Sequence, residues 1–266
     1  MYQLEDSTLL AQCDRIKAMI EETARTPAYQ KHYYASLYHH WKISSPVQLS
    51  DIREFEKQSG IELPVEYVYY LTQVGRGGAC PGTFFADFNP MRKVDEGIRR
   101  VSEQLACKLA ETEWEELYGG DSDWEGDRTD GTISLCAMDL TYIAYLIVTG
   151  PQRGRVVYMD YDCDRAPMYP KGSPDFLTWC ENFYSELLAG YDVTPTWKFM
   201  WQEPGNAHAL IHAFQNTKDQ KYRKEVIYSF CKFKDLSQEA YQFLESLRTS
   251  EWREDASEVL KKFSMI

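Results

Sequence analysis

The stretch GIELPVEYVYYLTQVGRGG, residues 60–78, decides how the centre of this chain begins to fold. Pro64 suits the first position of a helix, because its missing N–H is not needed there. The residues after it place apolar side chains at spacings of three and four, the period of one helix face: Tyr67, Tyr70, Leu71 and Val74. Gly75, Gly77 and Gly78 then supply positive-φ positions that end the helix and turn the chain. A phosphate-binding loop would place its glycines before a helix, so we expect a helix stop.

Helices are also predicted on both sides of this stretch. A short one over residues 51–60 has Asp51 and Glu54 spaced as a capping pair and Gly60 as its stop. A longer helical period runs over residues 94–117. Two N-terminal helices carry these apolar positions: Leu9, Cys13, Ile16 and Ile20 in the first, and Tyr29, Tyr33, Leu37 and Trp41, after Pro27, in the second.

Strands are concentrated in the middle of the chain. Three runs rich in β-branched and aromatic residues cover 132–138, 141–149 and 154–161, with glycine-containing punctuation between the last two. We expect them to form an antiparallel meander. A strongly marked helix follows, with Ser173 as N-cap and Pro174 at its first position. Its apolar face comprises Phe176, Trp179, Cys180, Phe183 and Leu187.

The last part of the chain has a different residue pattern. Residues 205–266 contain no strand-like run and parse into about four short helices. The helices are predicted to begin near Asn206, Gln220, Ser237 and Glu251. Two helix pairs are too few to establish a repeat, so we interpret them as a packed helical appendage. The chain thus divides into a helical N-terminal extension (1–47), a central domain (48–190) and a helical C-terminal appendage (200–266).

Composition indicates a soluble globular protein of 266 residues, 44% of them hydrophobic. No segment approaches the length of a membrane span, and the N-terminus carries acidic residues where a signal peptide would carry basic ones. We therefore expect a cytoplasmic protein with no membrane association. The seven cysteines include no C-x-x-C pair. They are predicted to be reduced core residues and not a disulfide framework or zinc site.

The negative charge is unevenly distributed. The net charge is −12, and residues 204–266 hold ten Lys/Arg and nine Asp/Glu, so the excess acid lies before them. Residues 111–130, the acidic segment, hold nine carboxylates against Arg128. Such a run repels nucleic acid and attracts basic partners, although it could also be a solvated loop that only keeps the protein soluble. Two tryptophans within it resemble binding anchors. The predicted partner-binding residues are Glu111, Glu113, Trp114, Glu115, Glu116, Asp121, Asp123, Trp124, Glu125, Asp127 and Asp130.

Four features in a fixed order resemble the SUKH superfamily, known through the fungal Smi/Knr cell-wall regulators and many bacterial immunity proteins. They are a Phe-Glu pair, a Gly then Leu-Pro before an aromatic helix and a Gly-Gly turn, a Gly-x-Val-Tyr strand, and a last helix that opens with Ser and Phe. The matching residues are Phe55, Glu56, Gly60, Leu63, Pro64, Gly77, Gly78, Gly154, Val156, Val157, Tyr158, Ser173 and Phe176. The resemblance covers residues 48–190. Arg76 departs from the usual Asn, and residues 94–117 with the acidic segment resemble an insertion.

This resemblance implies an α+β domain, with an antiparallel sheet flanked by helices, and a binding role without catalysis. Its core is predicted to contain Phe55, Leu63, Leu71, Ile143, Leu146, Val157, Phe176 and Phe183. Bacterial members are mostly antidotes that bind a toxin, often a nuclease. An acidic protein can mimic nucleic acid and block such a basic toxin domain. The alternative is an intracellular adaptor of the Smi/Knr type, whose C-terminal helices recruit a further protein.

A metal-dependent enzyme is a third possibility, resting on carboxylate and histidine spacings. His208 and His212 stand four apart but lack the Glu of an H-E-x-x-H motif. Asp121, Asp123, Glu125 and Gly126 imitate the start of a calcium loop, yet Thr132 occupies the position that needs a bidentate Glu.

The other acidic and histidine clusters have simpler interpretations. Asp160, Asp162 and Asp164 fall on one side of an extended chain, which we interpret as the solvent-facing side of a strand end. The clustered histidines are expected to pack among aromatic residues: His32, His39 and His40. We therefore expect no catalytic residue, no metal site and no cofactor.

Overall fold

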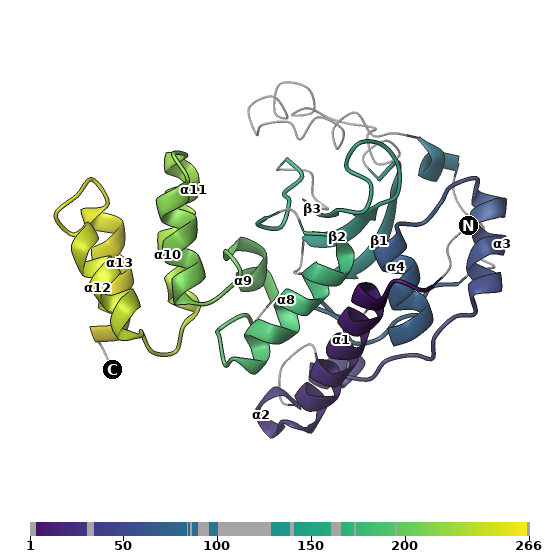
Figure 1. Ribbon diagram of the computed structural model, residues 1–266, viewed down its shortest axis with the longest axis horizontal. Coiled ribbons are helices and arrows are strands. Elements are labelled where there is room, and N and C mark those ends of the chain that lie inside the picture. The colour runs from purple at the N-terminus through teal and green to yellow at the C-terminus, as the bar shows by residue number, and fades with distance from the viewer. Residues whose placement is uncertain are drawn as a thin grey trace. The chain divides into compact units, whose positions relative to one another are not determined.

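The chain is divided into two compact units, Met1–Tyr184 (the sheet unit) and Ser185–Ile266 (the helical unit). The boundary lies inside helix α8 (Phe176–Leu188), so the last turn of that helix counts with the helical unit (Figure 1). The computed structural model describes residues 4–30, 35–83, 85, 87–89, 96–100, 129–138, 141–160, 166–172, 174–194 and 196–264.

Three strands form the antiparallel sheet of the sheet unit, in the order β1-β2-β3 (Figure 1). The strands are β1 (Thr132–Ala137), β2 (Tyr142–Ile147) and β3 (Val156–Asp160), which confirms the predicted meander and the α+β class. Ser134 pairs with Tyr145 and Cys136 with Ala144, so Leu135 is an extra residue that forms a β-bulge. Seven of the eight predicted core side chains are buried, whereas Ile143 is only half-buried.

The quoted stretch forms α4 (Val65–Tyr69), which continues as the π-helical turn η2 (Tyr70–Val74). Pro64 is the N-cap and not the first helical residue, because its ψ of 138° keeps it extended. The inward face is nevertheless as predicted, with these side chains buried: Tyr67, Tyr70, Leu71 and Val74.

The glycines after η2 serve two different purposes. Gly78 has a φ of +98°, a conformation that disfavours other residues, and confirms the predicted turn. Gly75 has a φ of 169° and Gly77 is not among the positive-φ glycines, so the predicted positive φ is wrong at both. Gly75 is instead required by close approach, since a Cβ at this position would collide with Ile43 and with the backbone carbonyl of Ser44. The turn thus packs directly on the segment that follows the N-terminal helices.

Helix α3 (Leu49–Ser59) begins earlier than predicted. Its N-cap is Gln48, which makes no side-chain capping bond, so the predicted Asp51–Glu54 capping pair is wrong. Asp51 lies in the first turn, where a negative charge favours the positive end of the helix dipole. Gly60 ends the helix with a φ of +70°, as predicted.

Helix α8 supplies most of the aromatic packing against the sheet. Asp175 caps it, because its Oδ1 accepts the N–H of Thr178 at 2.9 Å. The helix therefore begins two residues after the predicted first position, Pro174, and the predicted N-cap Ser173 lies outside the described residues. The predicted apolar face is buried throughout. Trp179 donates its indole N–H to the hydroxyl oxygen of Tyr158 on β3 at 2.7 Å.

The N-terminal helices belong to the sheet unit. Helix α1 (Ser7–Arg25) buries Cys13, Ile16 and Ile20 and packs on α4 and η2. Of the predicted second helix, the structure describes α2 (Pro27–Gln30) and the π-helical turn η1 (Ala35–His39), while residues 31–34 lie outside the described residues.

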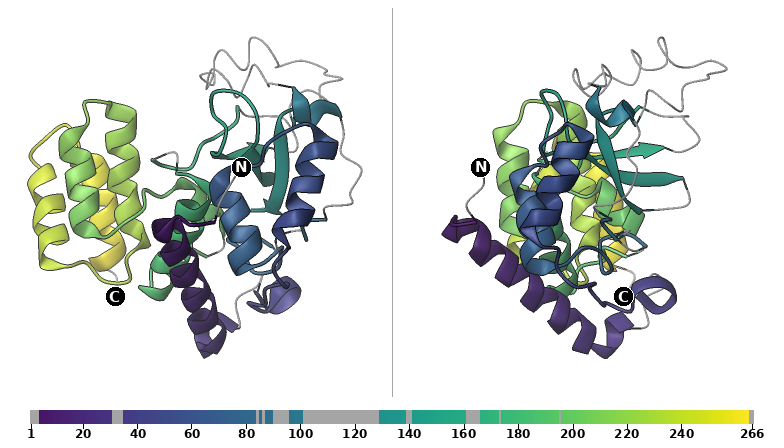
Figure 2. Two further views of the ribbon diagram at one scale, coloured as in Figure 1. Left: turned by 45° about the vertical axis from the view of Figure 1, so that its right-hand side comes forward. Right: turned by 90° about the vertical axis from the view of Figure 1, so that its right-hand side faces the viewer.

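The helical unit has an apolar core of its own. Its elements are α9 (Thr196–Trp201), α10 (Ala207–Asn216), α11 (Gln220–Ser229), the 3-10 turn η4 (Phe230–Lys232), α12 (Gln238–Leu247) and α13 (Arg253–Ser264). The four predicted starts are confirmed to within about two residues, and Asn206 and Ser237 are the N-caps of α10 and α12. Figure 2 shows α10 to α13 packed together in light green to yellow. Leu210, Val226, Phe230, Leu244 and Val259 are among the residues at the centre of this core.

Candidate protein-binding surface

Most of the predicted partner-binding residues lie outside the described part of the chain. Ten of the eleven fall between residues 101 and 128, and the eleventh is Asp130. The predicted helix over 94–117 is described only up to Arg100, where a 3-10 helix, η3, spans Glu96–Arg99. What the structure describes is therefore the base of the acidic segment, residues 96–100 and 129–131.

The two sides of this base are tied together. The N–H of Gly131 donates to the carbonyl oxygen of Gly97 at 3.0 Å. Nη1 of Arg100 lies 3.4 Å from Oδ2 of Asp130. The described segments on either side of residues 101–128 are therefore bonded directly to each other.

The base is also joined to the loop that follows β2. The hydroxyl of Thr149 donates to the carbonyl oxygen of Arg100 at 2.6 Å, and the N–H of Val148 donates to that of Gly131 at 2.7 Å. Gly131 has a φ of +68°, and a Cβ there would collide with both the Arg100 carbonyl and the Thr149 hydroxyl. A glycine is therefore required at position 131.

Arg99 connects the base to the end of α3. Its Nη2 donates to the carbonyl oxygen of Gln58 at 3.0 Å, and its Nε donates to that of Ser59. These carbonyls lie at the C-terminal end of the helix, where a cation is favoured by the helix dipole. The base is thus held by both the sheet and a helix of the sheet unit.

Asp130 has a different environment from a freely solvated carboxylate. Its side chain is 8% exposed and faces Arg100, whose side chain is 61% exposed. Arg100 therefore largely neutralises this negative charge within the base. Any long-range attraction of a basic partner would come mainly from the other eight carboxylates of the acidic segment.

A second exposed feature was missed by the sequence reasoning. The helical period placed Leu37 and Trp41 on one inward face, but Leu37 is 56% exposed and Trp41 is buried. The periodicity fails because η1 is π-helical and because His40 and Trp41 have φ values of +49° and +56°. Tyr38 is 50% exposed beside Leu37.

Trp41 holds the turn that carries Leu37 and Tyr38 in place. The indole N–H of Trp41 donates to the carbonyl oxygen of Tyr29 at 3.0 Å, and its ring lies edge-on to His39 and Tyr184. Two consecutive non-glycine residues at positive φ are unusual and carry conformational strain, which surrounding structure must hold in place. Such strain is often found at functional sites.

Of the histidine pair that suggested a metal, His208 contacts a carboxylate of another helix. Nδ1 of His208 lies 3.1 Å from Oε1 of Glu239, and both side chains are more than half exposed. Within the described residues no three His, Cys, Asp or Glu side chains converge on one point. Asp121 and Asp123 lie outside those residues, so the calcium-loop spacing stays a hypothesis.

Two further expectations can be compared with the structure. Asp160 is 7% exposed, so placing it on a solvent-facing strand end was wrong; every residue of β3 is buried. Asp162 and Asp164 lie outside the described residues. Cys13, Cys80, Cys136 and Cys180 are free and buried, as predicted, whereas Cys231 is free but only half-buried, and Cys107 and Cys163 lie outside the described residues. Burial raises the pKa of the Cys80 and Cys180 thiols well above the ordinary value, which disfavours the reactive thiolate.

The residues that carry the sequence resemblance build the scaffold. Oε1 of Glu56 accepts the N–H of Leu63 at 2.7 Å, and Nη2 of Arg153 donates to the Leu63 carbonyl at 2.8 Å. Burial raises the pKa of Glu56, while its bond from Leu63 opposes that rise. Phe55 packs edge-on against Phe88 with ring centroids 5.0 Å apart. These residues hold the Leu-Pro corner ahead of α4.

Comparisons of this chain with family models, with curated proteins and with solved structures find no match. No helix within the described ranges has the length and apolar character needed to cross a bilayer. The functional assignment therefore depends on the chain's own residues.

Proposed function

We propose that this chain is a non-catalytic binding protein of the SUKH type that neutralises a basic toxin domain by covering its active surface. The observation that carries the proposal is the acidic segment, with nine carboxylates, between two described segments that are bonded to each other in one pinned base. A segment anchored at both ends loses less conformational freedom on binding than a free tail of equal charge. The setting is cytoplasmic, where such an antidote would meet its toxin.

The roles of the resembling residues support a binding function. Glu56, Leu63 and Tyr158 are occupied by hydrogen bonding and packing inside the sheet unit. Residues with these roles leave recognition to exposed insertions and turns, which are free to vary without loss of the fold.

Two kinds of contact would act together in the complex. The carboxylates of the acidic segment would steer a basic partner and raise the association rate. Trp114 or Trp124 would serve as a desolvated anchor and slow dissociation. Leu37 and Tyr38, exposed on their braced turn, offer a second apolar contact.

The proposal is tested by co-purification with the product of the adjacent gene. The tagged chain should retain that protein and suppress its toxic activity in stoichiometric amounts. A variant with four carboxylates of the acidic segment changed to amides should lose most of this protection. A matched control changes four exposed carboxylates of the helical unit. Retention of full protection by the first variant would contradict the proposal.

An adaptor role is the alternative, and one observation favours it. The helical unit has its own apolar core and forms a compact unit separate from the sheet unit, as expected for a recruiting module. Deletion of residues 205–266 distinguishes the two functions. A toxin antidote that acts through the acidic segment should keep its activity, whereas an adaptor should lose its second partner.

A further inference from the structure

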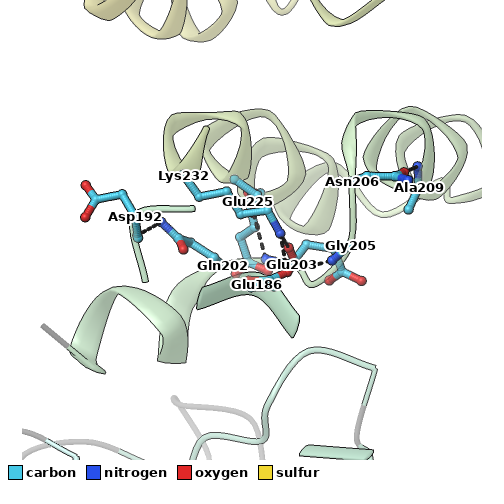
Figure 3. Close-up of polar contacts among 10 residues, drawn as sticks. Glu186, Asp192, Gln202, Glu203, Gly205, Asn206, Ala209, Glu225 and Lys232 are labelled. Atoms are coloured by element: carbon cyan, nitrogen blue, oxygen red, sulfur yellow. Dashed lines mark hydrogen bonds and ion pairs between the residues drawn. The ribbon is translucent and has the colours of Figure 1, made fainter. Parts of the chain in front are cut away.

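A buried polar cluster lies in the helical unit, away from the base of the acidic segment in sequence. It brings together Glu186 at the end of α8, Lys232 at the end of η4, and the turn of residues 202–205 between α9 and α10 (Figure 3). The side chains of Glu186 and Lys232 are 5% and 0% exposed. Buried ionisable groups in a small helical bundle are costly, so their protonation states have consequences.

Glu186 uses one carboxylate oxygen for all of its hydrogen bonds. Oε1 accepts from Nζ of Lys232 at 2.5 Å and from the N–H of Gly205 at 2.7 Å. Oε2 is buried and has no hydrogen-bond partner among the described residues. Both donors therefore bind one oxygen of the Glu186 carboxylate, and the other oxygen is left without a donor.

Lys232 is held from several directions. Nζ also donates to the backbone carbonyl of Glu203 at 2.6 Å, and it lies 5.3 Å from the ring centroid of Tyr191 and 5.8 Å from that of Phe233. Two aromatic faces and two oxygens form a suitable cage for an ammonium group. The geometry therefore keeps the positive charge on Lys232.

The side chain of Gln202, in the 202–205 turn, supplies a second buried acceptor that has no donor among the described residues. The amide of Gln202 donates from Nε2 to the carbonyl oxygen of Asp192 at 3.5 Å, while its own buried Oε1 has no donor. Oε2 of Glu186 and Oε1 of Gln202 are both acceptors. The species this part of the cluster lacks is therefore a donor.

The charges around the cluster point to which donor is missing. Burial lowers the pKa of Lys232, while the carboxylates of Glu186 and Glu203 oppose that shift and favour the ammonium. Asp192 is compensated separately by Lys198, with 2.5 Å between Oδ2 and Nζ. Tyr191 adds an aromatic face but no charge at neutral pH, because burial and Glu186 raise its pKa.

The remaining element packed against the cluster is the end of α11. Ser229 there accepts the N–H of Glu203 at 2.8 Å and donates to the carbonyl oxygen of Glu225. The side chain of Tyr222 on the same helix is hydrogen-bonded to Glu203, and burial, the carboxylate of Glu203, this hydrogen bond and the carboxylate of Glu225 raise the pKa of Tyr222, in that order. One ammonium thus stands against two carboxylates, and a single proton would restore neutrality.

We propose that Glu186 holds a proton on Oε2 in the folded helical unit, so that this unit takes up one proton as it folds. The neutral carboxyl of Glu186 and the charged Lys232 then hold the end of α8 and the 202–205 turn against η4. Loss of the proton would place a second negative charge inside the cluster and weaken these contacts.

The direction of the pH dependence follows from this assignment. Burial raises the pKa of Glu186 above its ordinary value of 4.5, and Lys232 and Gly205 only partly oppose the rise. Below the unfolded pKa the carboxyl is protonated in both states, so its full contribution is present. As the pH rises from there, the contribution falls until the folded pKa is passed.

The Glu186→Gln variant of the full chain tests whether the carboxyl of Glu186 is neutral or ionised in the folded protein. The amide reproduces a protonated carboxyl, with an oxygen for Lys232 and Gly205 and an N–H in place of the proton. The measurement is hydrogen-exchange protection of residues 186–205 from pH 5 to pH 8, normalised to the intrinsic exchange rate. The matched control is Glu245→Gln, which breaks a surface pair with Arg248 in the same unit.

Wild type and the control should lose about tenfold in protection per pH unit between the unfolded and folded pKa values and then level off. Glu186→Gln should lack this slope and stay within about threefold of wild-type protection at pH 7. A loss of about a hundredfold or more at pH 7 would mean that a buried ion pair had been broken and would overturn the proposal.

A direct titration keeps the proposal testable if the variant fails to fold. The carboxyl carbon of Glu186 in wild-type protein, observed by NMR, should titrate with a pKa that burial raises above the ordinary glutamate value. A carbon that is already ionised at pH 5 would contradict the assignment. If hydrogen-exchange protection rises with KCl concentration and not with acid, a bound metal cation and not a proton compensates Oε2 of Glu186. That result would also overturn the proposal.

Discussion

The two units bury polar groups in opposite ways. In the sheet unit, the hydrogen bond from Trp179 to Tyr158 joins two neutral groups under an aromatic cluster, and burial raises the pKa of Tyr158 so that it stays neutral. In the helical unit, the corresponding place is taken by Lys232 and Glu186. A neutral buried bond is insensitive to pH, whereas a charged one couples folding to protons. The Trp179–Tyr158 contact is thus insensitive to pH near neutrality, whereas the Glu186–Lys232 contact allows pH to modulate the stability of the helical unit.

The largest effect is expected from Trp179→Ala. Trp179 is fully buried, so the change should destabilise the sheet unit by about 3–5 kcal/mol through a cavity and should orphan the hydroxyl of Tyr158. Hydrogen exchange resolved between the two units measures it. Trp201→Ala, at a residue 43% exposed, is the control and should cost far less. Equal losses for the two variants would break the comparison.

Lys232→Met tests the charged half of the comparison. The methionine fills most of the space but leaves the Glu203 carbonyl and Oε1 of Glu186 without their ammonium donor. We expect a loss of about 3 kcal/mol, seen as lowered exchange protection in residues 185–266. Lys224→Met removes a lysine whose side chain is 58% exposed and pairs with Asp255, and it should cost under about 1 kcal/mol.

Glu56→Ala sharpens the comparison at a partly buried carboxylate of the sheet unit. The change removes the acceptor for the Leu63 N–H and should cost about 1–2 kcal/mol in chemical denaturation. Glu56→Gln keeps an acceptor oxygen and should recover most of that loss. Glu54→Ala, on an exposed position of the same helix, is the control. No recovery with Gln would mean that the negative charge, and not the hydrogen bond, is required.

Leu37→Ala should have the smallest effect on stability, under about 0.5 kcal/mol, because the side chain is mostly exposed. Its effect should appear instead in affinity for the partner, measured by titration calorimetry. Trp41→Ala, which removes the brace beneath the same turn, should lower both stability and affinity. A Leu37→Ala variant with unchanged affinity would remove this turn from the proposed interface.

Periodic features of the sequence predicted the fold well. The three strands and the buried face of α8 follow from residue type and spacing, which directly reflect which side faces the core. Cap positions were less accurate. Asp175, as good a capping residue as Ser173, caps α8, and α3 begins after Gln48 without any side-chain cap, which residue type cannot predict. The Leu37–Trp41 face failed because a π-helical turn and two positive φ values break the period of 3.6 residues.

The charged cluster could not be assembled from sequence, although one signal was present. Glu186 follows Phe183 by three residues on the apolar face of α8, where a carboxylate is out of place without a partner. Its partner Lys232 lies 46 residues later, in a 3-10 turn with no periodic pattern to show which side faces inward. Pairing them requires the tertiary fold.

The measurement that tests the central claim most directly is the salt dependence of association between this chain and its partner. Changing Glu113, Glu115, Asp121 and Asp123 to amides should slow association and flatten its salt dependence, because charge acts mainly on encounter and is screened by ions. Trp124→Ala should instead speed dissociation by about thirtyfold or more, as expected when an interface anchor is lost. An unchanged association rate and salt response in the fourfold variant would show that the acidic segment is a solubilising loop and that the interface lies elsewhere.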